Sequence, residues 1–109
     1  MTQLASYINA FSAGRAVIVG GDFNLHTDGE PDASQYAGLQ ATTGLTDVCA
    51  ALGCAAPGRI DKFLFRSSAG LTIEPLSWQF ETDVFVDGMG GPLSDHDALA
   101  VRFAWSVAP

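Results

Sequence analysis

Apolar side chains alternate with polar or small ones along much of the second half of the chain, and this pattern constrains the fold most strongly. A period of two indicates β-strands that bury one face. Residues 59–67 and 71–74 fit such strands, and Pro75 predicts an edge position or a bulge. The clearest strand covers residues 98–107, where four apolar side chains share one face: Leu99, Val101, Phe103 and Trp105.

The first half of the chain has helical spacing on both sides of a short apolar run. Residues 2–12 repeat apolar side chains at the spacing of one helix face, which predicts a helix. Residues 16–20 are apolar and rich in β-branched side chains, which predicts a buried strand. A second helix is expected over residues 32–44, and residues 45–52 fit a strand or a helix.

The order of these elements is helix, strand, helix and then mostly strands. This order predicts an α/β fold with a mixed β-sheet and helices on one side. The chain has 109 residues, the length of one small domain, so residues 1–109 are expected to form a single domain. Apolar residues make up 48% and charged residues 16%, a composition that can build a core and argues against disorder.

Twelve acidic residues against five basic ones give a net charge of −7. Nucleic-acid affinity comes from clustered Lys and Arg, so this balance argues against a broad nucleic-acid-binding surface. It argues equally against a polybasic membrane anchor. An acidic chain is compatible with binding a divalent cation where carboxylates converge.

Neither a membrane-spanning segment nor a secretory signal is found in the sequence. No apolar stretch is long enough to cross a bilayer, and the N-terminus lacks a basic region followed by a continuous apolar one. A soluble chain is therefore expected, with no compartment specified. Cys49 and Cys54 lack a CxxC motif or a second pair, so zinc is not expected. They are either two small buried thiols or a disulfide that closes a very short loop.

The predicted strand at residues 59–67 has two different faces. Asp61 lies on the same face as Phe63 and Phe65, and this aromatic face is predicted to be the core side. A carboxylate there is costly unless it is paired or bound to a metal. His96 is the obvious partner for Asp61, and an ion pair with a basic neighbour on its own strand is the alternative: Arg59 or Lys62.

Three polar clusters stand at or beside predicted strand ends: Asp22 with Asn24, Asp61, and Asp95 with His96. A His–Asp pair fixes the imidazole tautomer and raises its pKa, and an imidazolium suits a phosphoryl oxygen. Asp22 could accept a proton from water, and Asn24 could donate a hydrogen bond to phosphate. Asp95 could help hold Mg²⁺. Together these roles predict metal-assisted phosphoester hydrolysis.

The same residues also have structural interpretations. Asp22 and Asn24 could form an Asx turn after a strand, since such turns are common. Asp95 and His96 could lie in a solvated loop before the last strand. His26 belongs to no motif and is expected to be an exposed loop residue.

Three motifs occur in order along the chain: Gly21-Asp22-Phe23-Asn24, Arg59-Ile60-Asp61-Lys62-Phe63-Leu64-Phe65, and Pro92-Leu93-Ser94-Asp95-His96-Asp97-Ala98-Leu99. As a set they make nearly the whole chain resemble the C-terminal half of the endonuclease/exonuclease/phosphatase superfamily. Two segments are most similar to its neutral sphingomyelinase branch: residues 44–47 and 92–96. The resemblance implies half of a DNase I-like four-layer α/β sandwich.

The resemblance also implies an activity, a cofactor and residue roles. It implies a phosphodiesterase that uses Mg²⁺, or another divalent cation such as Mn²⁺, on a lipid or small molecule rather than DNA. Asp22 would activate water and Asn24 would orient the phosphate or the nucleophile. Asp61 would hold His96, His96 would meet the phosphoryl group, and Asp95 would lie at the metal.

Family members are much longer than this chain. The resemblance therefore implies a partial domain without the N-terminal half, which supplies an Asn and a Glu metal ligand and another catalytic His. Lys62 also departs from the family, because many relatives have an aromatic residue there. The sheet would expose an apolar face, which predicts a homodimer or docking onto the missing half. Two other functions stay open: a non-catalytic half-domain that self-associates, and a nuclease of the same superfamily.

Overall fold

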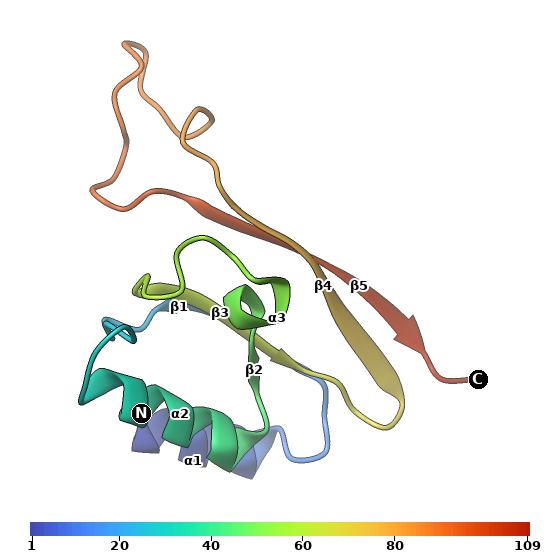
Figure 1. The fold of residues 1–109 in the computed structure, drawn as a ribbon. Coiled ribbons are helices and arrows are strands. Elements are labelled where there is room, and N and C mark those ends of the chain that lie inside the picture. Colours follow the sequence, from blue (N-terminus) through green and yellow to red (C-terminus); the bar gives the residue numbers. More distant parts are fainter.

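The computed structural model describes residues 1–109 and contains three helices and five strands in two antiparallel sheets (Figure 1). The elements run in the order α1 (Thr2–Phe11), β1 (Val17–Asp22), α2 (Asp32–Thr43), β2 (Thr46–Asp47), α3 (Val48–Leu52), β3 (Asp61–Arg66), β4 (Leu71–Phe80) and β5 (Leu99–Val107). The α/β class is confirmed. No helix is long and apolar enough to cross a membrane.

The first sheet has the strand order β1-β3-β2, and both outer strands run antiparallel to β3. The second sheet is the antiparallel pair β4 and β5. The prediction of a mixed sheet is therefore wrong, because no two neighbouring strands are parallel. The DNase I-like four-layer arrangement remains an expectation.

The strand predicted at residues 16–20 exists as β1, but it is not buried. β1 pairs only with β3, so it forms one edge of its sheet, and Ile18 is 49% exposed. A run of β-branched residues predicts a strand without specifying its neighbours. The prediction of burial was wrong because burial depends on what covers the strand.

The hydrophobic core lies between the two longer helices and one face of the first sheet. α1 and α2 lie side by side beneath this sheet in Figure 1. Seven buried residues form the cluster: Ala5, Ile8, Leu25, Tyr36, Leu39, Leu45 and Leu64.

The helix-covered face of β3 carries Leu64 and Lys62, with 0% and 4% of their surface exposed. The prediction that the Phe63 and Phe65 face is the core side was therefore wrong. Those two aromatic side chains are only partly buried on the opposite face, where Phe65 approaches Phe103 of β5 with ring centroids 6.1 Å apart. The prediction failed because a lysine was not expected in the core. The Lys62 ammonium is buried there because Thr27 and Pro57 accept its hydrogen bonds.

β4 and β5 form a long twisted ribbon that lies beside the first sheet (Figure 1). The register shifts between Pro75 and Ser77, so the bulge predicted at Pro75 is confirmed. Residues directly opposite one another share a face, and one ribbon face pairs Ile73 with Trp105 and Pro75 with Phe103. This apolar face turns toward the aromatic face of β3.

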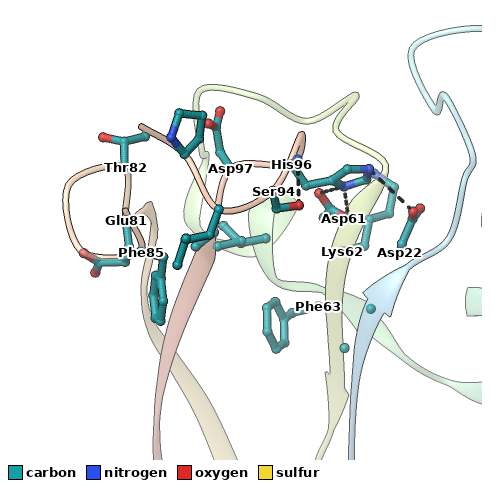
Figure 2. A pocket seen from close by; sticks show the side chains of 16 residues that line it. Asp22, Asp61, Lys62, Phe63, Glu81, Thr82, Phe85, Ser94, His96 and Asp97 are labelled. Carbon is teal, nitrogen blue, oxygen red and sulfur yellow. Dashed lines mark hydrogen bonds and ion pairs between the residues drawn. The ribbon is translucent and has the colours of Figure 1, made fainter. Parts of the chain in front are cut away.

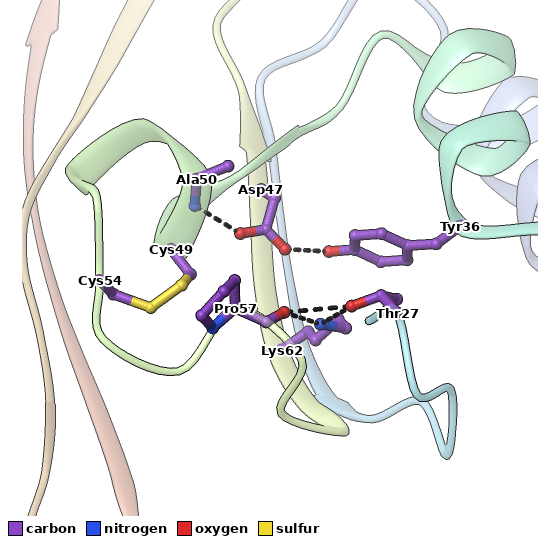
Figure 3. The surroundings of a disulfide bond; sticks show 8 residues. All are labelled: Thr27, Tyr36, Asp47, Cys49, Ala50, Cys54, Pro57 and Lys62. Atoms are coloured by element: carbon purple, nitrogen blue, oxygen red, sulfur yellow. Dashed lines mark hydrogen bonds between the residues drawn. A yellow bond between two sulfur atoms is a disulfide. The ribbon is translucent and has the colours of Figure 1, made fainter. Parts of the chain in front are cut away.

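The ambiguous segment at residues 45–52 contains both elements, because β2 leads directly into α3. The Asp47 carboxylate caps α3 by accepting a hydrogen bond from the Ala50 N–H at 2.8 Å. Gly53 ends α3 with a φ of 65°, a left-handed conformation that suits glycine. This turn brings the Cα atoms of Cys49 and Cys54 within 4.8 Å, and the two residues form a disulfide (Figure 3).

Candidate functional site

A cavity of about 780 Å³ lies between the ends of β1 and β3 and the long connection from β4 to β5 (Figure 2). Three of the predicted site residues line it: Asp22, Asp61 and His96. They come from three separate parts of the chain, namely the end of β1, the start of β3 and the loop before β5. The fold therefore brings together the side chains that the three motifs supply.

Asp22 and Asp61 lie directly opposite each other in the antiparallel pairing of β1 and β3. Directly opposed side chains of a strand pair are close together, and like charges at such positions repel. The side chains of Asp22 and Asp61 are 49% and 17% exposed, so water screens Asp61 less. A cation beside both carboxylates therefore lowers the electrostatic cost of this arrangement.

His96 lies beside both carboxylates. Its Nδ1 is 2.8 Å from Asp61 Oδ2 and 3.0 Å from Oδ1, and its Nε2 is 3.9 Å from Asp22 Oδ2. An ionised carboxylate can only accept, so His96 Nδ1–H is the donor to Asp61. The backbone N–H of His96 donates to Ser94 Oγ at 3.1 Å, and this bond fixes the loop that carries the imidazole (Figure 2).

The pKa of His96 is raised above its ordinary value of 6.5. The largest cause is the hydrogen bond to Asp61, followed by the negative charge of that carboxylate. Desolvation opposes this shift, and the charges of Asp22 and Asp95 add still smaller contributions that raise the pKa. The expected partnership of Asp61 and His96 is present in the structure, with the effect on the imidazole that such a pair produces.

Arg59 also pairs with Asp61, so the alternative ion pair exists beside the histidine pair. Arg59 Nη2 lies 3.0 Å from Asp61 Oδ2 in an ion pair that lacks hydrogen-bond geometry. The guanidinium stacks over the Phe80 ring at 5.1 Å from its centroid, which links Asp61 to β4. Lys62 makes no ion pair with Asp61, because its side chain lies on the other face of β3.

Asn24 and Asp95 lie near the three cavity residues but do not join them. Asn24 follows Asp22 with a φ of 52°, and its N–H donates to Asp22 Oδ1 at 2.8 Å. This is the Asx turn considered above, and it coexists with the contact of Asp22 to His96. Asp95 is exposed and does not line the cavity. Its role as a metal ligand stays a prediction.

A group that could hold a metal ion is formed by Asp22, Asp61 and His96, whose ligand atoms lie within 4.8 Å of one another. The arrangement of these groups favours a cation between them for a specific reason. With Nδ1–H directed at Asp61, a neutral His96 turns the lone pair of Nε2 toward the Asp22 carboxylate. A cation between these two electron-rich atoms, either a proton or a metal ion, makes the contact favourable.

The cavity also has lining residues for which no role was predicted. Phe63, Phe85 and Leu93 supply apolar surface, and Glu81 and Asp97 supply carboxylates. Asp97 follows His96 directly in the third motif, but no role was predicted for it. Phe85 and Glu81 come from the connection after β4, where no local pattern shows which loop residues face a cavity.

Comparison with known proteins gives one kind of match. The chain is 36% identical, over 94% of its length, to proteins named sphingomyelinase from Mycobacterium bovis and Mycobacterium tuberculosis. It spans about a quarter, 24%, of the length of these relatives. No family model matches the sequence, and no solved structure matches the chain. The name of these relatives, sphingomyelinase, agrees with the sphingomyelinase-like resemblance of the motifs.

Proposed function

We propose that this chain carries the His–Asp part of a metal-dependent phosphodiesterase site of the sphingomyelinase type, within the endonuclease/exonuclease/phosphatase superfamily. One observation supports this proposal above the others. Asp22, Asp61 and His96, distant in sequence, converge at the wall of one cavity. The chain in which they converge is similar to sphingomyelinases along 94% of its length.

Each residue has a role that follows from its contacts. The Asp61 carboxylate holds the His96 ring through Nδ1–H and favours the imidazolium. The protonated Nε2 then points into the cavity and donates to a phosphoryl or leaving-group oxygen as negative charge develops there. The Asp22 carboxylate accepts a proton from the attacking water, and the Asn24 amide is proposed to donate a hydrogen bond to the same phosphate.

Mg²⁺, or another divalent cation such as Mn²⁺, is proposed as the cofactor. When bound, it would neutralise charge on the phosphoryl oxygens and lower the pKa of coordinated water. The Asp22 side chain is 49% exposed and lines the cavity, so one of its oxygens could hold the ion while the other accepts the proton from water. Asp95 would reach it directly or through water, as the motif resemblance implies.

The proposed substrate is a lipid or small phosphodiester rather than DNA. Four carboxylates line the cavity, which repels a polyanion: Asp22, Asp61, Glu81 and Asp97. Beside them Phe85 and Leu93 are 57% and 66% exposed, so apolar surface borders the cavity. An amphiphilic substrate could place its phosphate at His96 and its apolar part on these side chains.

The substrate proposal is tested by comparing sphingomyelin in mixed micelles with duplex DNA, each with Mg²⁺ and with a chelator. We expect Mg²⁺-dependent release of phosphocholine and no DNA cleavage, and Asp22→Asn should abolish the release. Asp28→Asn is the matched control, because Asp28 is an exposed loop carboxylate outside the cavity. Cleavage of DNA in preference to sphingomyelin would contradict the proposed substrate class.

A second candidate function is a non-catalytic domain that acts by association. It is favoured by one observation, the large exposed apolar side chains on the strands. Trp105 and Val107 of β5 are 71% and 67% exposed, although they share a face with the buried Ile73. A partner that covers this face would stabilise the chain whether or not the site turns over.

A further inference from the structure

Lys62 is a buried charged residue that the proposed reaction does not use. It stands next to Asp61 on β3, and its side chain lies on the opposite face of the strand. Only 4% of its surface is exposed. Burying an ammonium is costly unless its donors are satisfied, so the contacts of Lys62 indicate what the charge does in this position.

The ammonium joins two loops to the strand (Figure 3). Lys62 Nζ donates to Thr27 Oγ1 at 3.0 Å and to the Pro57 carbonyl at 3.1 Å. Thr27 Oγ1 itself donates to the same carbonyl at 3.1 Å, so three groups meet at one point. The Tyr36 ring covers this junction, with its centroid 4.9 Å from Nζ.

No carboxylate forms an ion pair with Lys62. Burial lowers its pKa, and the more distant charges of Asp47 and Asp28 only partly oppose this effect. An apolar side chain of similar volume would fill the space without the desolvation cost. Stability alone is therefore a weak reason for a lysine at this position. A better explanation is that its ammonium holds the loops of Thr27 and Pro57 in place.

The two loops that Lys62 holds lead to two of the three site carriers, the end of β1 with Asp22 and the start of β3 with Asp61. Thr27 follows the Asp22–Asn24 turn at the end of β1, and Pro57 precedes Arg59 and Asp61 at the start of β3. Backbone contact between these segments at the site consists of the β1–β3 pairing and one further bond, from the Phe23 N–H to the Ile60 carbonyl. The bonds of Lys62 to Thr27 and Pro57 join the same two segments beyond Asp22 and Asp61, the last paired residues of β1 and β3.

We propose that Lys62 is a positioning residue for the candidate site. Its ammonium fixes the loop after β1 against the loop before β3, and so keeps Asp22 opposite Asp61 with His96 beside both. The proposed effect on catalysis rests on the proposed function, but the effect on loop geometry does not. Without the ammonium, the core and helices remain, and the turn that carries Asp22 and Asn24 gains freedom.

The test replaces the ammonium or its acceptor and compares the result with a change elsewhere in the same buried cluster. Lys62→Met removes the charge with similar volume, and Thr27→Val removes the acceptor, so a folded variant is available even if the first is unstable. Tyr36→Phe is the matched control, since it breaks the bond to Asp47 and leaves the loop junction intact. All are assayed well below their melting temperatures.

Two readouts separate positioning from simple destabilisation. We expect faster hydrogen exchange at the Phe23 and Asn24 amides in Lys62→Met and Thr27→Val, and unchanged exchange there in Tyr36→Phe. We expect kcat to fall by about 10- to 100-fold in the first two variants with little change in KM, as for other residues that orient site groups.

Unchanged exchange and kcat in Lys62→Met and Thr27→Val would overturn the positioning proposal. Equal changes in Tyr36→Phe would also overturn it, because the effect would then reflect general destabilisation. If the wild-type chain hydrolyses no phosphodiester, the proposed function fails, and the exchange rates alone still decide the role of Lys62.

Discussion

His96 owes its position to carboxylates from two opposite strands. Asp61 accepts its Nδ1–H at 2.8 Å, and Asp22 lies 3.9 Å from Nε2. The two ring nitrogens therefore have different environments. Nδ1 donates to Asp61 and orients the ring, whereas Nε2 remains free to bind a proton, a phosphoryl oxygen through that proton, or a cation. The chemistry proposed for this chain depends on that division.

The pH dependence of the His96 imidazole follows from this pairing. In an NMR titration, His96 should titrate above its ordinary value of 6.5. Asp61→Asn should lower this pKa, because the substitution removes the accepting carboxylate and its charge. Equal midpoints in wild type and Asp61→Asn would show that the pair does not form in solution.

The raised pKa of His96 also makes the free energy of unfolding depend on pH. Because the folded pKa is raised, the pair contributes stability that is fully present below the unfolded pKa of about 6.5. This contribution is lost as the pH rises through the folded pKa. The difference in melting temperature between wild type and Asp61→Asn should therefore be largest on the acidic side of this range and shrink above it.

At the scale of elements, Arg66 connects both longer helices to β3. Its guanidinium donates to the Ser12 and Thr43 carbonyls at the C-terminal ends of α1 and α2, and to the Arg15 carbonyl in the turn between α1 and β1. A cation at a helix C-terminus also interacts favourably with the helix dipole. Arg66 at the end of β3 therefore joins the core packing in holding the helix layer against the sheet.

Arg66→Met should lower the free energy of unfolding by at least about 2 kcal/mol, because three carbonyl acceptors lose a charged donor. Arg102→Met is the control, since Arg102 is exposed on β5 and makes no ion pair, and it should change stability by less than about 0.5 kcal/mol. Urea unfolding of both variants measures this. Similar losses for the two would contradict the role given to Arg66.

Most elements could be predicted from periodicity, but their environments could not. The strand at Asp61–Arg66 was expected, yet its core face was assigned wrongly because Phe63 and Phe65 look more apolar than Lys62. The contacts that bury Lys62 come from Thr27 and Pro57, which no local pattern connects to it. The convergence of Asp22, Asp61 and His96 was predictable only because three motifs occurred in order. The stacking of Arg59 on Phe80 and the position of the lining residue Glu81 depend on the tertiary fold.

At the scale of the whole molecule, the chain has a small core and a large apolar surface. Only 13 of 109 residues are buried, and those in the hydrophobic cluster lie on the helix side of the first sheet. The opposite side is covered only in part by the β4–β5 ribbon, which leaves Ile18 and Trp105 exposed. A molecule of this kind gains stability from a partner that covers the remaining apolar face.

We propose that a second copy of the chain covers this face. Sedimentation velocity should show a concentration-dependent dimer, and Trp105→Lys should shift it toward monomer by placing a charge on the face. Lys substitution at Thr72, an exposed residue of β4, is the control and should leave the dimer intact. A monodisperse wild-type monomer at all concentrations would contradict self-association.

The most direct test of the proposed site is hydrolysis of bis-p-nitrophenyl phosphate with Mg²⁺ and with a chelator. His96→Ala removes the imidazole, and His26→Ala is the matched control because His26 is exposed and outside the cavity. We predict Mg²⁺-dependent turnover in wild type and His26→Ala, and its loss in His96→Ala. Turnover in wild type no higher than in His96→Ala would show that Asp22, Asp61 and His96 do not form a working site in this chain.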